Sequence, residues 1–276
     1  MTKGLTIRDC AVCGMFYPSE SETIRKDIAR MFDQVERIAG IGTVRGVVSP
    51  HAGYMYSGFT AAHGYAHLQG KNYATVVVVS PSHREYFDGI SVYAGDGYST
   101  PLGEVMLNTD LREKLLARSS IVTASEWGHS DEHAIEVQLP FLQLALPGFT
   151  FLPVVMGDQK REYCVELGEA LASVLADENY LLVASTDLSH YYNYRKATEL
   201  DAVFIEDVRK FDHVRLMSDI EAGKTEGCGG GPTVAVMIAL QRLGVKKMTV
   251  LHHCNSGDVT GDHGRVVGYL SAIAHA

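Results

Sequence analysis

Short apolar runs rich in β-branched residues alternate along the chain with segments whose apolar residues recur at helical spacing. Four of the runs have the length and the flanking residues of buried strands; they are residues 44–49, 75–80, 151–156 and 180–185. The stretch 24–38 is instead amphipathic, and Ser19 with Glu22 predicts a capping box at its start. Alternating strands and helices indicate the α/β class.

Further elements continue this alternation to the end of the chain. Helices are predicted at 59–68, 109–118, 133–146, 161–176, 198–222 and 232–244, and closing strands at 248–252 and 265–274. No Pro/Ser-rich linker, low-complexity tract or tandem repeat divides the sequence. We therefore predict a single domain over residues 1–276, in which helices flank a central mixed or mostly parallel sheet.

The charge balance restricts the class of partner. With 24 Lys and Arg against 33 Asp and Glu, the formal net charge is −9, and no basic cluster is present. Nucleic acids and anionic membranes need a concentrated basic surface, so neither is expected as a partner. Residues 1–17 lack the apolar core of a secretory signal, and no apolar run is long enough to cross a bilayer. A cytoplasmic protein is therefore expected.

The five cysteines form an odd set, which is typical of reduced thiols or ligands and not of a disulfide framework. They are Cys10, Cys13, Cys164, Cys228 and Cys254. The sequence Cys10-Ala-Val-Cys13 resembles half of a redox or zinc motif. Because the chain has no second pair of this kind, a structural role is favoured for these two cysteines.

Three histidines follow three of the predicted strands. Ser-Pro sequences at 49–50 and 80–81 end the first two strands and lead to His51 and His83, and His190 follows the strand 180–185. Proline stops a strand, and ligands of open α/β sheets bind beyond the carboxyl ends of the strands. The three imidazoles are therefore expected to converge as metal ligands or acid/base groups. The alternative for each is an ordinary core or capping histidine.

Cys228 lies in a glycine-rich turn, with Gly229, Gly230 and Gly231 after it and Pro232 in the first turn of the helix that follows. A thiol at a helix N-terminus is expected to lose its proton more easily, which favours a metal ligand or a nucleophile. The alternative is a small buried residue in a tight turn. The glycine spacing matches neither a P-loop nor a dinucleotide fingerprint, so no nucleotide is inferred.

Other polar groups are weaker candidates. The segment 129–133 has two histidines four residues apart but not the His-Glu-x-x-His order of zinc proteases, so a surface or helix-start position is expected for His129. His133 and Glu136 reach the crevice if the preceding loop folds over it. Polar residues at 252–258 end a strand and are candidates for the same rim, although turn chemistry also explains them. His275 is expected in a terminal tail.

Six motifs in order along the chain together resemble the Memo family, also called AmmeMemoRadiSam system protein B. They are Ala11-Val-Cys-Gly-Met-Phe-Tyr-Pro18, Ser49-Pro-His-Ala-Gly-Tyr54, Ser80-Pro-Ser-His83, Asp131-Glu-His-Ala-Ile-Glu136 with Leu139-Pro140, Ser185-Thr-Asp-Leu-Ser-His190 and Ser256-Gly-Asp-Val-Thr-Gly-Asp262. That family is similar in fold to the class III extradiol ring-cleaving dioxygenases. The resemblance implies one α/β domain with a metal in a crevice at one sheet edge.

The resemblance also implies roles for individual residues. The metal ligands are expected to be His51, His83 and Cys228, with His190 as the acid/base histidine, Asp187 beside it and His133 lining the pocket. The dioxygenases use two histidines and a carboxylate, whereas this chain supplies two histidines and a cysteine. A thiolate is a softer ligand that suits iron, copper or zinc, with iron or copper favoured.

These roles lead to one main expectation and two alternatives for the function. The main expectation is a metal-dependent, dioxygenase-like oxidoreductase that acts on a small aromatic or other diol-like substrate. His190 then removes a phenolic proton, and Tyr54 orients the substrate. One alternative is a metal- and peptide-binding module of the phosphotyrosine type that lacks turnover. The other is a zinc-dependent hydrolase with His190 or Asp187 as the base.

Overall fold

Four parallel strands form the centre of the molecule. The computed structural model describes residues 4–276, and in it these strands lie in the order β2 (Val44–Ser49), β9 (Tyr180–Ser185), β3 (Thr75–Pro81) and β8 (Thr150–Met156). They are almost wholly buried. Strands covered on both faces need nearly continuous apolar sequences. All four predicted strands are therefore confirmed to within a residue at each end.

Shorter strands extend this sheet in mixed directions. On one side β12 (Val266–His275) runs antiparallel to β2 and pairs with β11 (Lys247–Asn255) and β10 (His190–Tyr192). On the other side β4 (Ile90–Tyr93) runs antiparallel to β8, and β7 (Val122–Ser125) runs parallel to β4. A separate sheet contains β1 (Ile7–Arg8), β5 (Gly97–Thr100) and β6 (Gly103–Met106).

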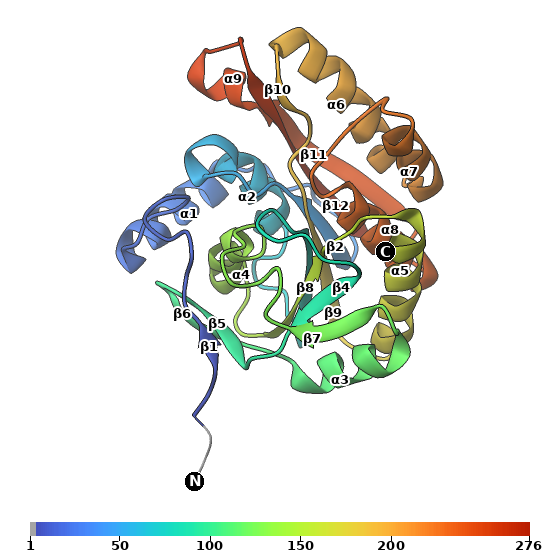
Figure 1. Ribbon diagram of the computed structural model, residues 1–276. Coiled ribbons are helices and arrows are strands. Elements are labelled where there is room, and N and C mark those ends of the chain that lie inside the picture. Colours follow the sequence, from blue (N-terminus) through green and yellow to red (C-terminus); the bar gives the residue numbers. More distant parts are fainter. Residues whose placement is uncertain (1–3) are drawn as a thin grey trace.

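Helices cover both faces of the large sheet (Figure 1). One face packs against α1 (Ser21–Asp33), α2 (Phe59–Ala66) and α4 (Leu139–Ala145). The opposite face packs against α3 (Thr109–Arg118), α5 (Arg161–Leu175), α6 (Tyr194–Arg209), α7 (His213–Glu221) and α8 (Gly230–Arg242). The short elements η1 (Tyr54–Gly58), η2 (Glu136–Gln138) and α9 (Ser256–Thr260) complete the chain.

The molecule has two hydrophobic cores, one on each face of the large sheet, and alternate residues of a central strand point into one or the other. Val76 and Val78 of β3 lie in the core under α1, α2 and α4. Val77 and Val79 of the same strand lie in the core under α5 and α8. Successive side chains of a strand point to opposite faces, so a sheet between two helical layers needs apolar residues at both sets of positions. The predicted mixed α/β sheet flanked by helices is thus confirmed.

Three predicted helices differ from those observed. No side chain caps α1, whose N-cap is Glu20, so the predicted capping box at Ser19 does not form, and the helix ends at Asp33. The stretch 133–146 is helical only from Glu136, because the preceding residues wrap around a buried carboxylate described below. The stretch 198–222 divides into α6 and α7, because Phe211 takes a left-handed φ of 56° and Asp212 caps a new helix.

Two expectations about the chain ends and the thiols are wrong. His275 was expected in a terminal tail, but it is the last residue of β12 and is buried, because this strand extends through His275. Cys10 and Cys13 form a disulfide, whereas all five cysteines were expected as thiols or ligands. The turn that joins them brings their Cα atoms to 5.9 Å, a separation that permits a disulfide. Within residues 4–276, no helix combines the length and apolarity needed to span a bilayer.

Candidate metal centre

The carboxyl ends of β2 and β3 bring two imidazoles together. Both strands pair with β9 and run parallel to it, so their ends meet at one edge of the sheet. His51 lies two residues beyond β2, and His83 lies two residues beyond β3. Their ring centroids are 5.0 Å apart and the rings are nearly perpendicular. The predicted convergence of these two histidines is therefore present in the fold.

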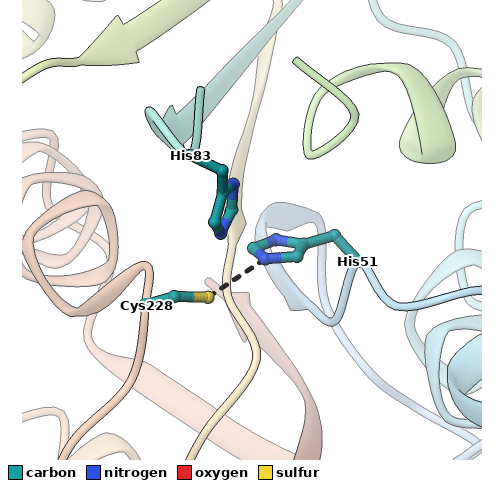
Figure 2. Close-up of side chains that lie close together, drawn as sticks. All are labelled: His51, His83 and Cys228. Atoms are coloured by element: carbon teal, nitrogen blue, oxygen red, sulfur yellow. Dashed lines mark hydrogen bonds between the residues drawn. The ribbon is translucent and has the colours of Figure 1, made fainter. Parts of the chain in front are cut away.

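Cys228 reaches the same edge from the turn before α8. Its Sγ lies 3.0 Å from His51 Nε2, as Figure 2 shows. A Cβ on Gly229 would lie 2.1 Å from the Ser185 carbonyl oxygen, so only glycine allows the turn to pack this closely against β9. One ligand atom from each of His51, His83 and Cys228 lies within 4.8 Å of the other two. Two imidazoles and a thiol at these distances can hold one metal ion.

The hydrogen bonds around His51 fix which of its ring nitrogens is free. The Ser185 hydroxyl donates to the Ala134 carbonyl at 2.7 Å and accepts from Gln138 Nε2 at 2.9 Å. Since its proton is already used, the hydroxyl must also accept from His51 Nδ1 at 2.9 Å. The proton of the neutral ring is therefore on Nδ1, and the lone pair of Nε2 points toward Cys228.

A buried carboxylate sets the same tautomer in His83. Glu132 accepts from His83 Nδ1 at 2.9 Å and from the backbone amides of His83, His133 and Ala134. Burial acts to raise the pKa of Glu132, but these bonds and the adjacent imidazoles outweigh it and hold the pKa at about 2. The ionised carboxylate can only accept, so His83 Nδ1 carries the proton and Nε2 is free. Both histidines thus fit a metal bound through Nε2.

Burial is the largest influence on the pKa values of His51 and Cys228. Burial, and next the neighbouring His83, lowers the pKa of His51, which favours the neutral ring that a metal requires. Burial, and next the Asp187 carboxyl, raises the pKa of Cys228 well above its ordinary value. The expected easy loss of the thiol proton is therefore wrong for the protein alone, because desolvation outweighs the helix N-terminus. A bound cation would instead lower the pKa of a thiol that coordinates it.

A second cluster shares His83 with this centre and contains Glu132 and His133. His133 Nδ1 lies 3.3 Å from Glu132 Oε1, and burial, together with His51, lowers the pKa of His133 to about 3. The Glu132 carboxylate is already bonded to His83. These contacts hold His83 in its orientation. We therefore interpret this cluster as a set of supporting residues for the centre formed by His51, His83 and Cys228, and not as a second metal site.

A cavity of about 590 Å³ opens beside the two histidines. His133, Asp187 and His190 also line it, as does Phe16, whose ring centroid lies 4.8 Å from that of His133. Asp187 accepts from the backbone amide of His51 at 2.7 Å, and its own amide donates to Cys228 Sγ at 3.3 Å. Burial raises the pKa of Asp187. Asp187 therefore fixes the positions of two candidate ligands.

Tyr54, the residue expected to orient the substrate, is not among the residues that line this cavity. Its hydroxyl donates to the Val137 carbonyl at 2.7 Å, and its ring packs against Phe141 with centroids 4.8 Å apart. Tyr56 lines the cavity instead. Both residues belong to the helical element η1, where two positions correspond to about half a turn and so to opposite sides.

The structure also tests three further expectations about polar residues near the site. His129 is fully buried, lies outside any helix and bonds Tyr98 and Ser91, so the expected surface or helix-start position is wrong and its role is structural. Glu136 does not line the cavity, because its carboxylate accepts from Arg8, from the amides of Ala11 and Val12 and from the Tyr17 hydroxyl. Ser256 lines the cavity, whereas Asn255 and Asp258 form the capping box of α9.

The fold and the site together define a mixed α/β protein with a His-His-Cys candidate metal centre. The family model described as Memo-like protein matches residues 8–273, and the chain belongs to the Memo family. A "MEMO1 family protein" of Methanosarcina mazei is 39% identical over 272 residues, covering 98% of this chain and 99% of that protein.

More distant relatives agree with the family assignment, and a solved structure shares the fold. Family members from Methanopyrus kandleri and Thermoplasma acidophilum are 35% and 34% identical, covering 96% and 97% of this chain and 98% of each relative. The crystal structure of an uncharacterized protein from Escherichia coli K12 has a TM-score of 0.54 and 16% identity, covering 85% of this chain and 100% of that one. At that identity, the likeness shows the fold alone.

Proposed function

We propose that the protein is a metal-dependent oxidoreductase, resembling the extradiol dioxygenases, that acts on a small aromatic diol. The observation that carries this proposal is the grouping of two imidazoles with free Nε2 atoms and one thiol, in which both imidazoles line a cavity of about 590 Å³. In this proposal His51, His83 and Cys228 hold iron or copper. A bound iron or copper ion would supply one-electron chemistry for the reaction of a diol with dioxygen.

The protein positions the ligands before any substrate enters. Ser185 and Glu132 each accept the Nδ1 proton of one histidine, so both rings are oriented without rearrangement. Asp187 holds the backbone of His51 and the sulfur of Cys228. Such supporting hydrogen bonds tune affinity and geometry at a metal site.

His190 is the proposed proton acceptor. It lines the cavity, and its backbone amide donates to Glu226 Oε1 at 3.1 Å, which anchors the residue next to the centre. A diol must lose two phenolic protons to bind through both oxygens, and an imidazole can take one at a ring nitrogen and return it later. Phe16, Tyr56 and Tyr269 also line the cavity, and aromatic side chains favour contact with a flat ring.

Oxygen consumption after anaerobic loading with iron(II) tests this proposal. We expect oxygen uptake with at least one catechol, and a decrease of about 100-fold or more in His190→Ala with its iron content unchanged. His253→Ala is the matched control, because His253 is exposed on β11 and does not line this cavity. Its uptake should equal that of the unaltered protein.

Three outcomes contradict the proposal. The first is no oxygen uptake with any catechol. The second is binding of a phosphotyrosine peptide that is independent of metal, without chemistry, which favours the peptide-binding module. The third is a purified protein that contains zinc alone and hydrolyses esters, which favours the hydrolase.

A further inference from the structure

One arginine lies in the wall of the cavity. Arg265, immediately before β12, is the only Lys or Arg among the described residues that line it. Its guanidinium carbon lies 5.2 Å from the centroid of the Tyr191 ring. Over residues 4–276, no carboxylate oxygen lies within 4.0 Å of its guanidinium nitrogens. The positive charge of Arg265 is therefore available to a molecule inside the cavity.

The backbone of β10 is shaped to place Tyr191 beside this arginine. Adjacent residues of a regular strand point to opposite faces, yet His190 and Tyr191 both line the cavity. A bulge lies between His190 and Tyr192 in the pairing with β12, and Tyr191 has a left-handed φ of 64°. Bulges redirect side chains, and strained backbone at a non-glycine residue is concentrated at functional sites.

The acidic residues that share the cavity with Arg265 do not pair with it. Two carboxylic residues line the cavity, and their described bonds come from the backbone: Asp187 accepts from the amide of His51, and Asp262 accepts from the amide of Gly264. In a chain of net charge −9, an unpaired arginine is the feature that makes one end of the cavity attractive to an anion.

We propose that Arg265 binds a carboxylate carried by the aromatic ring of the substrate, so that the substrate class is an aromatic diol with an acidic substituent. This inference rests on the proposed function for the diol end of the molecule. The planar guanidinium can bond both oxygens of a carboxylate, and Tyr191 supports the guanidinium from one side. Arg265 is thereby a specificity-determining residue.

Binding to the full chain loaded with zinc tests this inference without turnover. Titration calorimetry compares 3,4-dihydroxybenzoate with 3,4-dihydroxybenzamide, which has nearly the same shape and no charge. We expect the benzoate to bind about tenfold more tightly at low salt, because the bond to Arg265 is charge-assisted. The preference should decrease as the ionic strength rises.

Substitutions assign the preference to one side chain. In Arg265→Gln the two ligands should bind equally, and in Arg265→Lys a part of the preference should remain. Arg209→Gln is the matched control, because it removes the same charge from an exposed arginine on α6 that pairs with Glu206. Its preference should equal that of the unaltered protein. Arg265 is exposed, so its replacement should leave the melting temperature unchanged.

The results separate this inference from the proposed function. It is overturned if the unaltered protein does not prefer the benzoate, if Arg265→Gln keeps the preference, or if neither ligand binds. A preference that depends on Arg265, with no oxygen uptake by the iron-loaded protein, supports the inference and contradicts only the oxidative activity. Oxygen uptake with catechol and no preference for the benzoate supports the activity and contradicts only the inference.

Discussion

Two side chains that do not belong to the His-His-Cys set determine which nitrogens of its histidines are free. Ser185 holds the proton of His51 on Nδ1, and Glu132 does the same for His83. The motifs contain both residues, but sequence alone assigned no role to either. Glu132 is 49 positions from His83, and Ser185 is 134 from His51. Only the folded chain places these partners together.

The hydroxyl of Ser185 is therefore expected to matter for metal affinity. In Ser185→Ala, His51 Nδ1 loses its acceptor, and the proton can move to Nε2, where it blocks coordination. We expect metal affinity to decrease about 10- to 100-fold, measured by competition with a coloured chelator.

Ser91→Ala is a matched control for that substitution, because Ser91 is equally buried and bonds His129, which is not a candidate ligand. It should lower the melting temperature and leave metal affinity unchanged. Equal affinity losses in the two variants would show that the Ser185 result reflects general loosening of the fold.

At the scale of elements, the turn before α8 depends on close backbone contact. In Gly229→Ala the new methyl group would meet the Ser185 carbonyl oxygen at 2.1 Å and the Thr186 Cβ at 2.7 Å. The turn must move, and Cys228 with it. We expect a loss of about 1–3 kcal/mol in the free energy of unfolding and weaker metal binding. Urea titration and metal competition measure the two effects.

Gly148→Ala is the control, since its Cβ meets nothing within 4 Å and its backbone is not left-handed. It should change neither quantity. Unaltered metal binding in Gly229→Ala would contradict the view that this turn fixes the position of Cys228.

Elements differ in how far sequence predicts them. The parallel strands are continuous apolar runs and were predicted within a residue, whereas β1, β4 to β7 and β10 have two to four residues each and carry no such pattern. The break between α6 and α7 depends on one left-handed residue, Phe211, and the bulge at Tyr191 depends on another. Neither residue type signals that conformation, so Tyr191 and Arg265 could not be assigned to the cavity from sequence.

At the scale of the whole molecule, buried neutral imidazoles predict sensitivity to acid. Burial lowers the pKa of His129 and of His133 to about 3, against 6.5 for the free side chain. The unfolded chain therefore binds more protons as the pH falls below about 6.5, and the free energy of unfolding decreases down to about pH 3. Protonation of Glu132 also lowers the free energy of unfolding as the pH falls from 4.5 to about 2, because the folded state depresses the pKa of this carboxyl.

Urea unfolding of the metal-free protein at several pH values measures this loss, which we expect to be on the order of several kcal/mol between pH 7 and pH 4. In His129→Gln the dependence on pH should be weaker, whereas His253→Gln, at an exposed position, should retain it. Stability that does not change from pH 7 to pH 4 would contradict the burial of neutral histidines.

The carboxylate of Glu136 joins the beginning of the chain to the wall of the cavity. It is fully buried, and all of its described partners come from the segment between Arg8 and Tyr17, which also carries Phe16. Removal of the residues up to Tyr17 would leave the Glu136 carboxylate buried without its partners. It would also remove Phe16 from the wall of the cavity. A protein shortened in this way should lose both solubility and ligand recognition, although it would retain all three candidate metal ligands.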